Sequence, residues 1–186
     1  FAYGYTTGNV SMSNLVNNSG VVAADVTGVG TARYGLAAAS YGTDKALFGY
    51  GSTGSNVSLT NLVNNSGVVA TDTTGVGTAR RFPAAAIYGG DKAIFGYGYD
   101  GTRASMTNLV SNSGVVAADV TGVGTGRSGL AAASYGGDKA IFGYGNTGSV
   151  TAVSNLVSNS GVVATDTTGV GTARVDLAAA GYSITA

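Results

Sequence analysis

The sequence consists of one 47-residue unit repeated four times, and this periodicity restricts the fold more than any other feature. The motif Phe-X-Tyr-Gly begins at Phe1, Phe48, Phe95 and Phe142. Asn-Leu-Val, Gly-Val-Val-Ala and Gly-Val-Gly-Thr recur with the same spacing, and no insertion breaks it. We therefore divide the chain, as a single domain, into repeats 1–47, 48–94, 95–141 and 142–186. Units of this size cannot bury their apolar faces alone, so each is expected to pack against its neighbours.

Each unit is predicted to contain four short β-strands. The chain has 32 Gly and one Pro, a composition that disfavours long helices. In the second copy the expected strands are 57–63, 68–72, 84–88 and 91–97, with a hairpin turn at 64–67. The Ala-Ala-Ala stretches that start at Ala37, Ala84, Ala131 and Ala178 fit innermost strands, where small side chains allow close approach. Tight packing within one sheet is the alternative explanation.

Four-stranded units of this length predict an all-β fold, a β-propeller in which each sheet is one blade. The chain starts inside the second strand of a blade, at Phe1, and ends after a first strand at 178–182. We therefore predict four 47-residue blades closed into a ring by pairing of the N- and C-terminal strands. A slice of a larger ring, or two chains sharing eight blades, are the alternatives. Because the first residue is not Met, we expect a processed end, a fragment or part of something longer.

One stretch of the second and third copies resembles the kelch repeat. It runs from Arg80 through Ala84-Ala85-Ala86 and a Gly-Gly-Asp-Lys turn to the segment 93–98, in which Tyr97 separates two glycines. The segment 70–80 also resembles kelch-like arrays of phage and environmental bacterial proteins. The resemblance implies propeller blades, and a protein displayed outside a cell or on a virus particle.

The composition argues against several classes of function. Nine basic and nine acidic residues give zero net charge, so no field attracts nucleic acid or an anionic membrane surface. The absence of Cys removes disulfides and thiolate sites, and the absence of His removes the usual general base and metal ligand. No apolar run approaches the ~20 residues that span a bilayer. We predict no catalytic residues, no cofactor and no metal.

The four copies differ mainly in two sets of loops. In an antiparallel blade, the loop between the second and third strands opens at the same end as the connection to the next blade. Both variable sets are therefore predicted on one face of the domain, and the two nearly fixed turns, 17–20 and 42–45 with their counterparts, on the other. Loops on a rigid scaffold often bind ligands, although unconstrained loops also drift in sequence. The candidate binding residues are Tyr5, Tyr34, Phe82, Tyr99, Asp100, Arg103 and Asp176.

A repeated acid–base pattern is given a structural role instead. Each copy carries an Asp with an Arg eight residues later, and a group present in every unit is poorly suited to be a unique catalytic site. We expect each Asp to cap a turn or to pair with the nearby Arg. These residues are Asp25, Arg33, Asp72, Arg80, Asp119, Arg127, Asp166 and Arg174. Glycosylation sequons occur at Asn9, Asn17, Asn56 and Asn64.

These observations together predict a non-enzymatic structural or surface-display propeller, extracellular or on the surface of a virion. Its partners would be proteins, either further copies of itself or neighbouring structural subunits. The alternative is a lectin-like adhesin that binds a surface glycan through the variable loops, because aromatic rings stack on sugars and hydroxyl groups hydrogen-bond to them.

Overall fold

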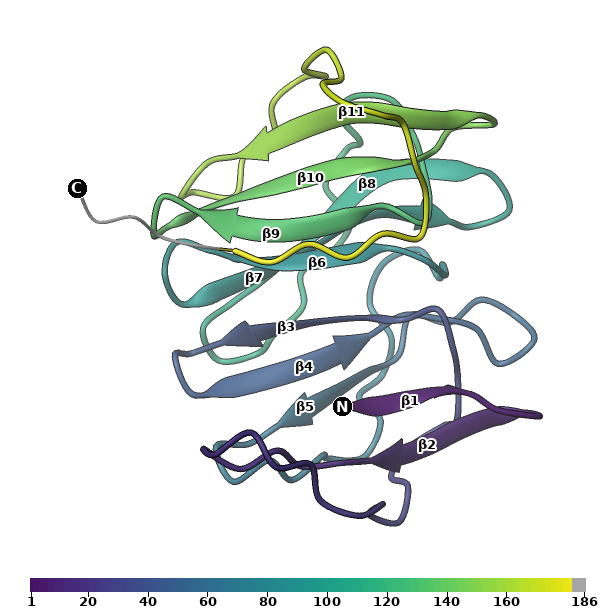
Figure 1. The fold of residues 1–186 in the computed structure, drawn as a ribbon, viewed down its shortest axis with the longest axis vertical. Helices are drawn as coiled ribbons and strands as arrows, with labels where there is room; N and C mark the ends of the chain where they lie inside the picture. The colour runs from purple at the N-terminus through teal and green to yellow at the C-terminus, as the bar shows by residue number, and fades with distance from the viewer. Residues whose placement is uncertain (182–186) are drawn as a thin grey trace.

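The computed structural model describes residues 1–181, which form eleven β-strands and no helix (Figure 1). The first sheet has two strands, β1 (Ala2–Tyr5) and β2 (Asn9–Ser13). The other three sheets have three strands each: β3 (Ala37–Tyr41), β4 (Lys45–Gly49) and β5 (Thr60–Val63); β6 (Ala84–Tyr88), β7 (Lys92–Tyr99) and β8 (Arg103–Val110); β9 (Ala131–Tyr135), β10 (Lys139–Asn146) and β11 (Val150–Val157). All strand pairs are antiparallel, which confirms the all-β prediction.

The alanine-rich strands lie where neighbouring sheets meet, as predicted. Strand β6 contacts both β3 and β9, so the first strands of successive units pack side by side (Figure 1). A ladder of backbone hydrogen bonds links the loops that precede these strands. Phe82 N donates to Gly35 O, Gly129 N to Phe82 O, and Asp176 N to Gly129 O, at 2.6, 3.2 and 2.9 Å. Equivalent positions 47 residues apart are therefore in direct contact.

In each unit, the strand expected after the hairpin turn, which is 68–72 in the second unit, is not formed as a regular strand, and that part of the prediction is wrong. We call this segment the fourth strand. In the second unit, isolated bridges join Val63 to Val69 and Thr60 to Thr73. The two bridges are three residues apart on one side and four on the other, so one extra residue interrupts the ladder. The side chain of Asn61 compensates, because its Nδ2 donates to Ala70 O at 3.0 Å.

Each junction between sheets is centred on a Phe that packs against the preceding unit. The ring of Phe95 meets that of Tyr50 edge to face, with centroids 5.1 Å apart, and Phe142 meets Tyr97 in the same way at 5.2 Å. A glycine lies beneath the rings of Phe95 and Phe142, whereas the equivalent residue at the first junction, where Phe48 meets Tyr3, is Ala2. A Cβ on Gly49 would come within 2.6 Å of the Phe95 ring. The repeated Phe-Gly-Tyr motif thus provides both the ring and the space for the next ring.

The predicted closure of the ring is not formed among residues 1–181. Strand β1 pairs with β2 alone, and the sheets make an open stack with β1 and β11 at opposite ends (Figure 1). The segment 175–181 runs alongside β9, and the last residue of the predicted terminal strand, 182, lies outside the described residues. The junctions form between units adjacent in sequence, and these contacts do not bring the fourth sheet to the first. Within residues 1–181, no helix is long and apolar enough to cross a bilayer.

Candidate functional site

A buried arginine joins each pair of neighbouring sheets. Arg80 is fully buried, and its Nε donates to Tyr97 O at 2.7 Å, its Nη1 to Thr78 O at 3.1 Å and its Nη2 to Asn108 Oδ1 at 2.7 Å. Its guanidinium lies 4.0 Å from the centroid of the Tyr50 ring. The cation is therefore held by charge-assisted hydrogen bonds and a cation–π contact.

An aspartate of the next unit completes this arrangement. The carboxylate of Asp119 accepts hydrogen bonds from Thr78 N and Oγ1, the shorter at 2.7 Å, and from Asn108 Nδ2 at 2.9 Å. Burial alone would raise the pKa of Asp119, but these hydrogen bonds and Arg80 outweigh it and hold the pKa below its usual value. We call the set of Arg, Thr, Asn and Asp a junction cluster. The same cluster recurs at Thr31, Arg33, Asn61 and Asp72, and at Thr125, Arg127, Asn155 and Asp166.

These contacts correct the expected pairing of each Asp with the Arg eight residues later. Asp119 lies 4.0 Å from Arg80 of the preceding unit, and Asp72 lies 3.8 Å from Arg33. Packing of one unit on the next brings these residues together. The clusters are also complete within themselves, because no buried side-chain nitrogen or oxygen in the described part of the chain lacks a hydrogen-bond partner.

The clusters contain no group poised for proton transfer near neutral pH. Burial raises the pKa of Tyr50 to about 12, so the phenol stays neutral beneath the guanidinium of Arg80. Its hydroxyl donates to Val76 O at 3.3 Å. No three side chains of His, Cys, Asp or Glu come together among residues 1–181. The repeated polar residues therefore serve the junctions between sheets.

The two sets of variable loops lie together, as the strand order requires. Backbone bridges connect Tyr34 to Ser52, Arg81 to Tyr99, and Ser128 to Asn146, each joining the loop before one sheet to the second loop of that sheet. At the opposite end, the nearly invariant turns, 17–20 and 42–45 with their counterparts, are joined by hydrogen bonds such as Asn112 Nδ2 to Asp91 Oδ2 at 3.0 Å. We call the end that carries the variable loops the loop face.

A row of aromatic rings crosses part of the loop face. The rings of Tyr5 and Tyr34 are 5.9 Å apart, and those of Tyr34 and Phe82 are 6.0 Å apart, both edge to face. Tyr5 is 65% exposed and Phe82 is 37% exposed. Phe82 has a φ of 55° at a position occupied by Gly35 in the preceding unit, so its backbone is strained. Three of the predicted binding residues thus form one continuous surface.

Tyr99, Asp100 and Arg103 form a second group on this face. The guanidinium of Arg81, a residue that the sequence analysis missed, lies 4.7 Å from the Tyr99 ring centroid. Asp100 Oδ1 accepts from its own loop, from Thr102 N at 2.8 Å. Arg103 reaches the next unit and donates to Asn146 Oδ1 at 2.7 Å. The neighbouring-loop contacts of Arg81 and Arg103 depend on packing between units, which the sequence pattern does not display.

The other predicted residues are distributed elsewhere. Asp176 is exposed at the last connection, next to Gly129. Asn17 and Asn64 are exposed, and each side chain closes its own turn by accepting from two backbone amides. Asn9 and Asn56 instead donate to Ser52 O and Tyr99 O on the loop face. Of the four sequons, those at 17 and 64 thus lie at the end opposite the loop face.

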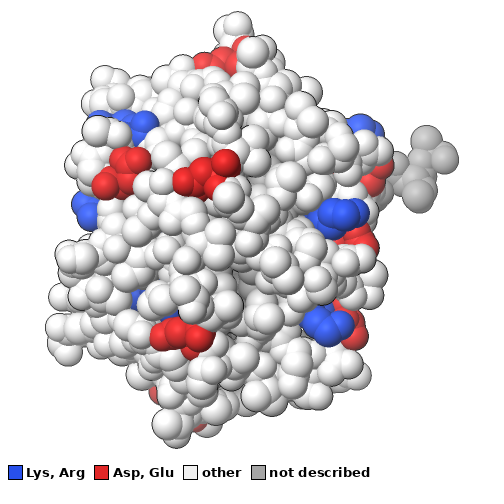
Figure 2. All heavy atoms as spheres, turned by 180° about the vertical axis from the view of Figure 1, so that it is seen from behind, with Lys and Arg blue, Asp and Glu red and all other residues white. Residues whose placement is uncertain are grey.

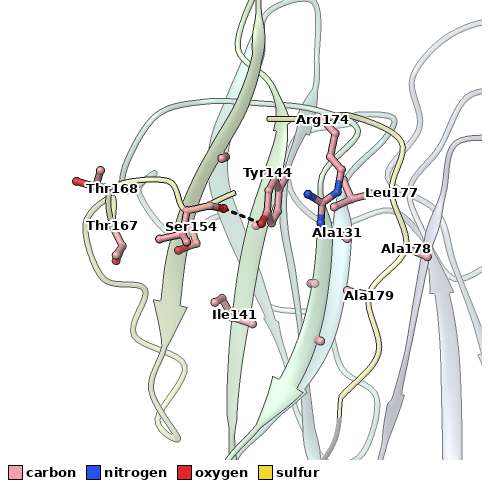
Figure 3. A pocket seen from close by; sticks show the side chains of 15 residues that line it. Ala131, Ile141, Tyr144, Ser154, Thr167, Thr168, Arg174, Leu177, Ala178 and Ala179 are labelled. Atoms are coloured by element: carbon pink, nitrogen blue, oxygen red, sulfur yellow. Dashed lines mark hydrogen bonds between the residues drawn. The ribbon is translucent and has the colours of Figure 1, made fainter. Parts of the chain in front are cut away.

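The fourth sheet carries a hollow of about 290 Å³ that the sequence analysis did not predict (Figure 3). It lies between β10, β11 and the segment 174–179, and Ile141, Gly143 and Tyr144 form part of its lining. The Tyr144 hydroxyl donates to Val170 O at 2.9 Å. Arg174 lies 4.0 Å over the Tyr144 ring, and its guanidinium donates to Thr172 O at 3.0 Å. We call this hollow the C-terminal face.

The rest of the surface has few charges. The face opposite the view of Figure 1 shows scattered acidic and basic side chains and no broad area of either sign (Figure 2). Several charges are paired locally, such as Lys45 with Asp44 at 2.9 Å. The face seen in Figure 2 therefore shows no basic patch of the kind that attracts a polyanion.

The solved structure of YjhT shares this fold. It superimposes with a TM-score of 0.61 over 85% of this chain, with 13% sequence identity. The match covers 52% of the YjhT chain, so the present chain spans about half the length of that structure. No protein-family model and no curated protein matches the sequence. The comparison therefore shows the fold alone, and a function has to be argued from the residues of this chain.

Proposed function

We propose that this chain is a non-enzymatic structural module, displayed outside a cell or on a virus particle, whose sheets are the blades of a kelch-like propeller. One observation carries the proposal. The Arg, Asn, Thr and Asp common to every interior junction are linked by hydrogen bonds between sheets, as Arg80 is to Asn108 and Thr78 to Asp119. Conserved chemistry within the repeat is thus devoted to stacking sheets, which is the task of a structural element.

The propeller assignment rests on the arrangement of the blades and on the resemblance of the sequence to kelch repeats. The first strands of successive units, β3, β6 and β9, pack against one another while later strands lie further out (Figure 1). In a propeller the innermost strands meet around an axis in this way. Ring closure follows if the missing inner strand beside β1 is supplied by a segment equivalent to 178–181.

Electron microscopy of the purified chain, combined with an activity screen, tests the structural role. We expect rings or ordered polymers with regular spacing and no turnover of glycoside, ester or phosphate substrates. Turnover that exceeds the buffer rate and is lost on unfolding would refute the non-enzymatic assignment. Attachment of the chain to virus particles or to cell-surface fibres would support the proposed location.

A second candidate function is glycan binding by the loop face. The observation that favours it is the row formed by Tyr5, Tyr34 and Phe82, because exposed aromatic rings beside backbone carbonyl groups suit the apolar and polar faces of a sugar. The stack of Arg81 on Tyr99 extends the same surface.

A glycan array separates the two candidates. Binding that is lost in Tyr5→Ala and Tyr99→Ala would favour the lectin-like function, whereas a blank array leaves the structural role. Val115→Ala is the matched control, because Val115 is 65% exposed but belongs to the outer segment of its unit, away from the loop face.

A further inference from the structure

The three interior junctions of the stack share the same contacts. Each has a Phe ring against the Tyr of the preceding unit, and at the second and third junctions the ring also lies over a Gly, as Phe142 lies over Gly96 and Tyr97. Each also has an Asn and an Asp that bind the Arg and Thr of the preceding unit, as at Arg80 and Asn108. The junction is asymmetric, because its two sides contribute different residues.

The first sheet presents one half of this junction with no partner on it. Phe1, equivalent to Phe95, is 78% exposed, while Phe95 is fully buried. Val16 is 47% exposed, while its equivalent Val110 is fully buried. The carboxylate of Asp25 accepts a hydrogen bond from Asn14 at 2.8 Å. This Asn–Asp bond is the part of a junction cluster that lies within one unit.

The C-terminal face presents the other half. Gly143, equivalent to Gly96, has nothing within 4 Å of the position that a Cβ would occupy, whereas at Gly96 that position is 2.6 Å from a Phe ring. Arg174 is exposed and stacks on Tyr144, as Arg80 stacks on Tyr50. The hollow of Figure 3 thus lies where a ring of the next sheet would pack.

We propose that the C-terminal face binds the first sheet of a second copy of this chain. The Phe1 ring then packs on Gly143 and Tyr144. Asn14 accepts a hydrogen bond from Arg174, and Asp25 accepts from the backbone N and Oγ1 of Thr172. The segment 178–181 lies along the free edge of β1, where the other sheets have an inner strand. The contact repeats the interior junction in every pairing, and it rests on the structural role proposed above.

Two observations favour a second copy over closure within one chain. The two half-junctions lie at opposite ends of the stack (Figure 1). The chain also matches only 52% of the YjhT structure, so the fold it shares accommodates roughly twice as much chain. A head-to-tail contact of this type either closes into a ring of copies or extends as a polymer, and both use the same two surfaces.

The test uses the untagged chain that starts at Phe1, in sedimentation velocity over a range of concentrations. Phe1→Asp blocks the first sheet, and Arg174→Glu blocks the C-terminal face by repelling Asp25. Both residues are exposed, so neither variant should unfold the chain. Val115→Asp is the control, because its position is 65% exposed within an interior unit whose junctions are formed.

We expect dimers or longer assemblies of the unmodified chain and of Val115→Asp. Each face variant should weaken association by about 30-fold or more. A 1:1 mixture of the two face variants should form a dimer and nothing larger, since one intact face of each kind remains. A chain that stays monomeric up to its solubility limit, or a mixture that fails to associate, overturns the proposal. Turnover or glycan binding would instead count against the proposed function, in separate assays.

Discussion

Replacing Arg80 by Met removes the buried cation of one junction while keeping most of its volume. The change deletes hydrogen bonds of 2.7 Å to Tyr97 O and 2.7 Å to Asn108 Oδ1, and a cation–π contact at 4.0 Å. Two buried acceptors lose their charged donor, at a cost of roughly 1–3 kcal/mol each. Breaking a buried charged network by removing one partner costs about 3–5 kcal/mol in total. We therefore expect Arg80→Met to lower the free energy of unfolding by about 4 kcal/mol.

Arg174→Met is the matched control, because it makes the same change at the equivalent position of the last unit. Arg174 is exposed and keeps one hydrogen bond, to Thr172 O at 3.0 Å, with its stack on Tyr144. Its loss should cost about 0.5–1 kcal/mol, the usual value of an exposed cation–π contact. The difference between the two variants isolates the effect of burial and of the Asn108 contact.

Urea titration followed by circular dichroism and tyrosine fluorescence measures both variants. It is run at a protein concentration where the chain is monomeric, so that Arg174 reports on the free C-terminal face. In thermal unfolding, at about 2–4 °C per kcal/mol, Arg80→Met should lower Tm by roughly 8–16 °C. Equal losses for the two variants, or a loss below about 1 kcal/mol for Arg80→Met, would refute the assigned role of the buried arginine.

Three further predictions concern glycines, turns and pH. Gly96→Ala should lower the free energy of unfolding by about 1–3 kcal/mol, because the new Cβ would lie 2.6 Å from the Phe142 ring. Gly143→Ala, with nothing within 4 Å of its Cβ position, should cost less in thermal unfolding, and equal effects would contradict the packing. Thr43→Gly should raise stability by about 1 kcal/mol, since Thr43 has a φ of 70° where the other turns carry Gly90 and Gly137; an unchanged urea midpoint would argue against strain there. The folded state lowers the pKa values of Asp72, Asp119 and Asp166, so their ionised carboxylates stabilise the fold above the unfolded pKa of about 3.9. The free energy of unfolding should fall as the pH drops through the lower folded pKa values. An acid titration of this free energy that shows no such loss would contradict the clusters.

Much of the strand pattern was predictable, because it depends on short-range features. The alternation of residues and the turn at 64–67 predicted a hairpin, and Gly67 has the expected positive φ of 78°. The alanine strands lie where neighbouring sheets meet, as the contacts of β6 with β3 and β9 show. The 47-residue period and the antiparallel strand order placed both variable loop sets at one end.

The junction clusters were not predictable from sequence, since their partners are set by packing between units. Arg80 binds Asn108, 28 residues away, while the nearer candidate, Asp72, binds Thr31 of the preceding unit. The segment 68–72 was predicted to be a regular strand because turn signals bound it, but the Asn61 side chain takes the place of a ladder hydrogen bond. The stack of Arg81 on Tyr99 was also missed, because Arg81 occurs in one copy only and gives no repeat signal.

The differences among the four copies now have a physical explanation. A residue whose side chain binds the neighbouring unit, such as Asn108, must stay complementary to a residue that is itself repeated, so both are fixed. Ser52, Tyr99 and Asn146 occupy one equivalent position, yet each is held to the preceding loop by backbone hydrogen bonds, as in Ser52 N to Tyr34 O at 2.8 Å. Backbone pairing is indifferent to the side chain, so this position varies at no cost to the stack. Sequence variation at this position therefore lies on a surface that stacking leaves free.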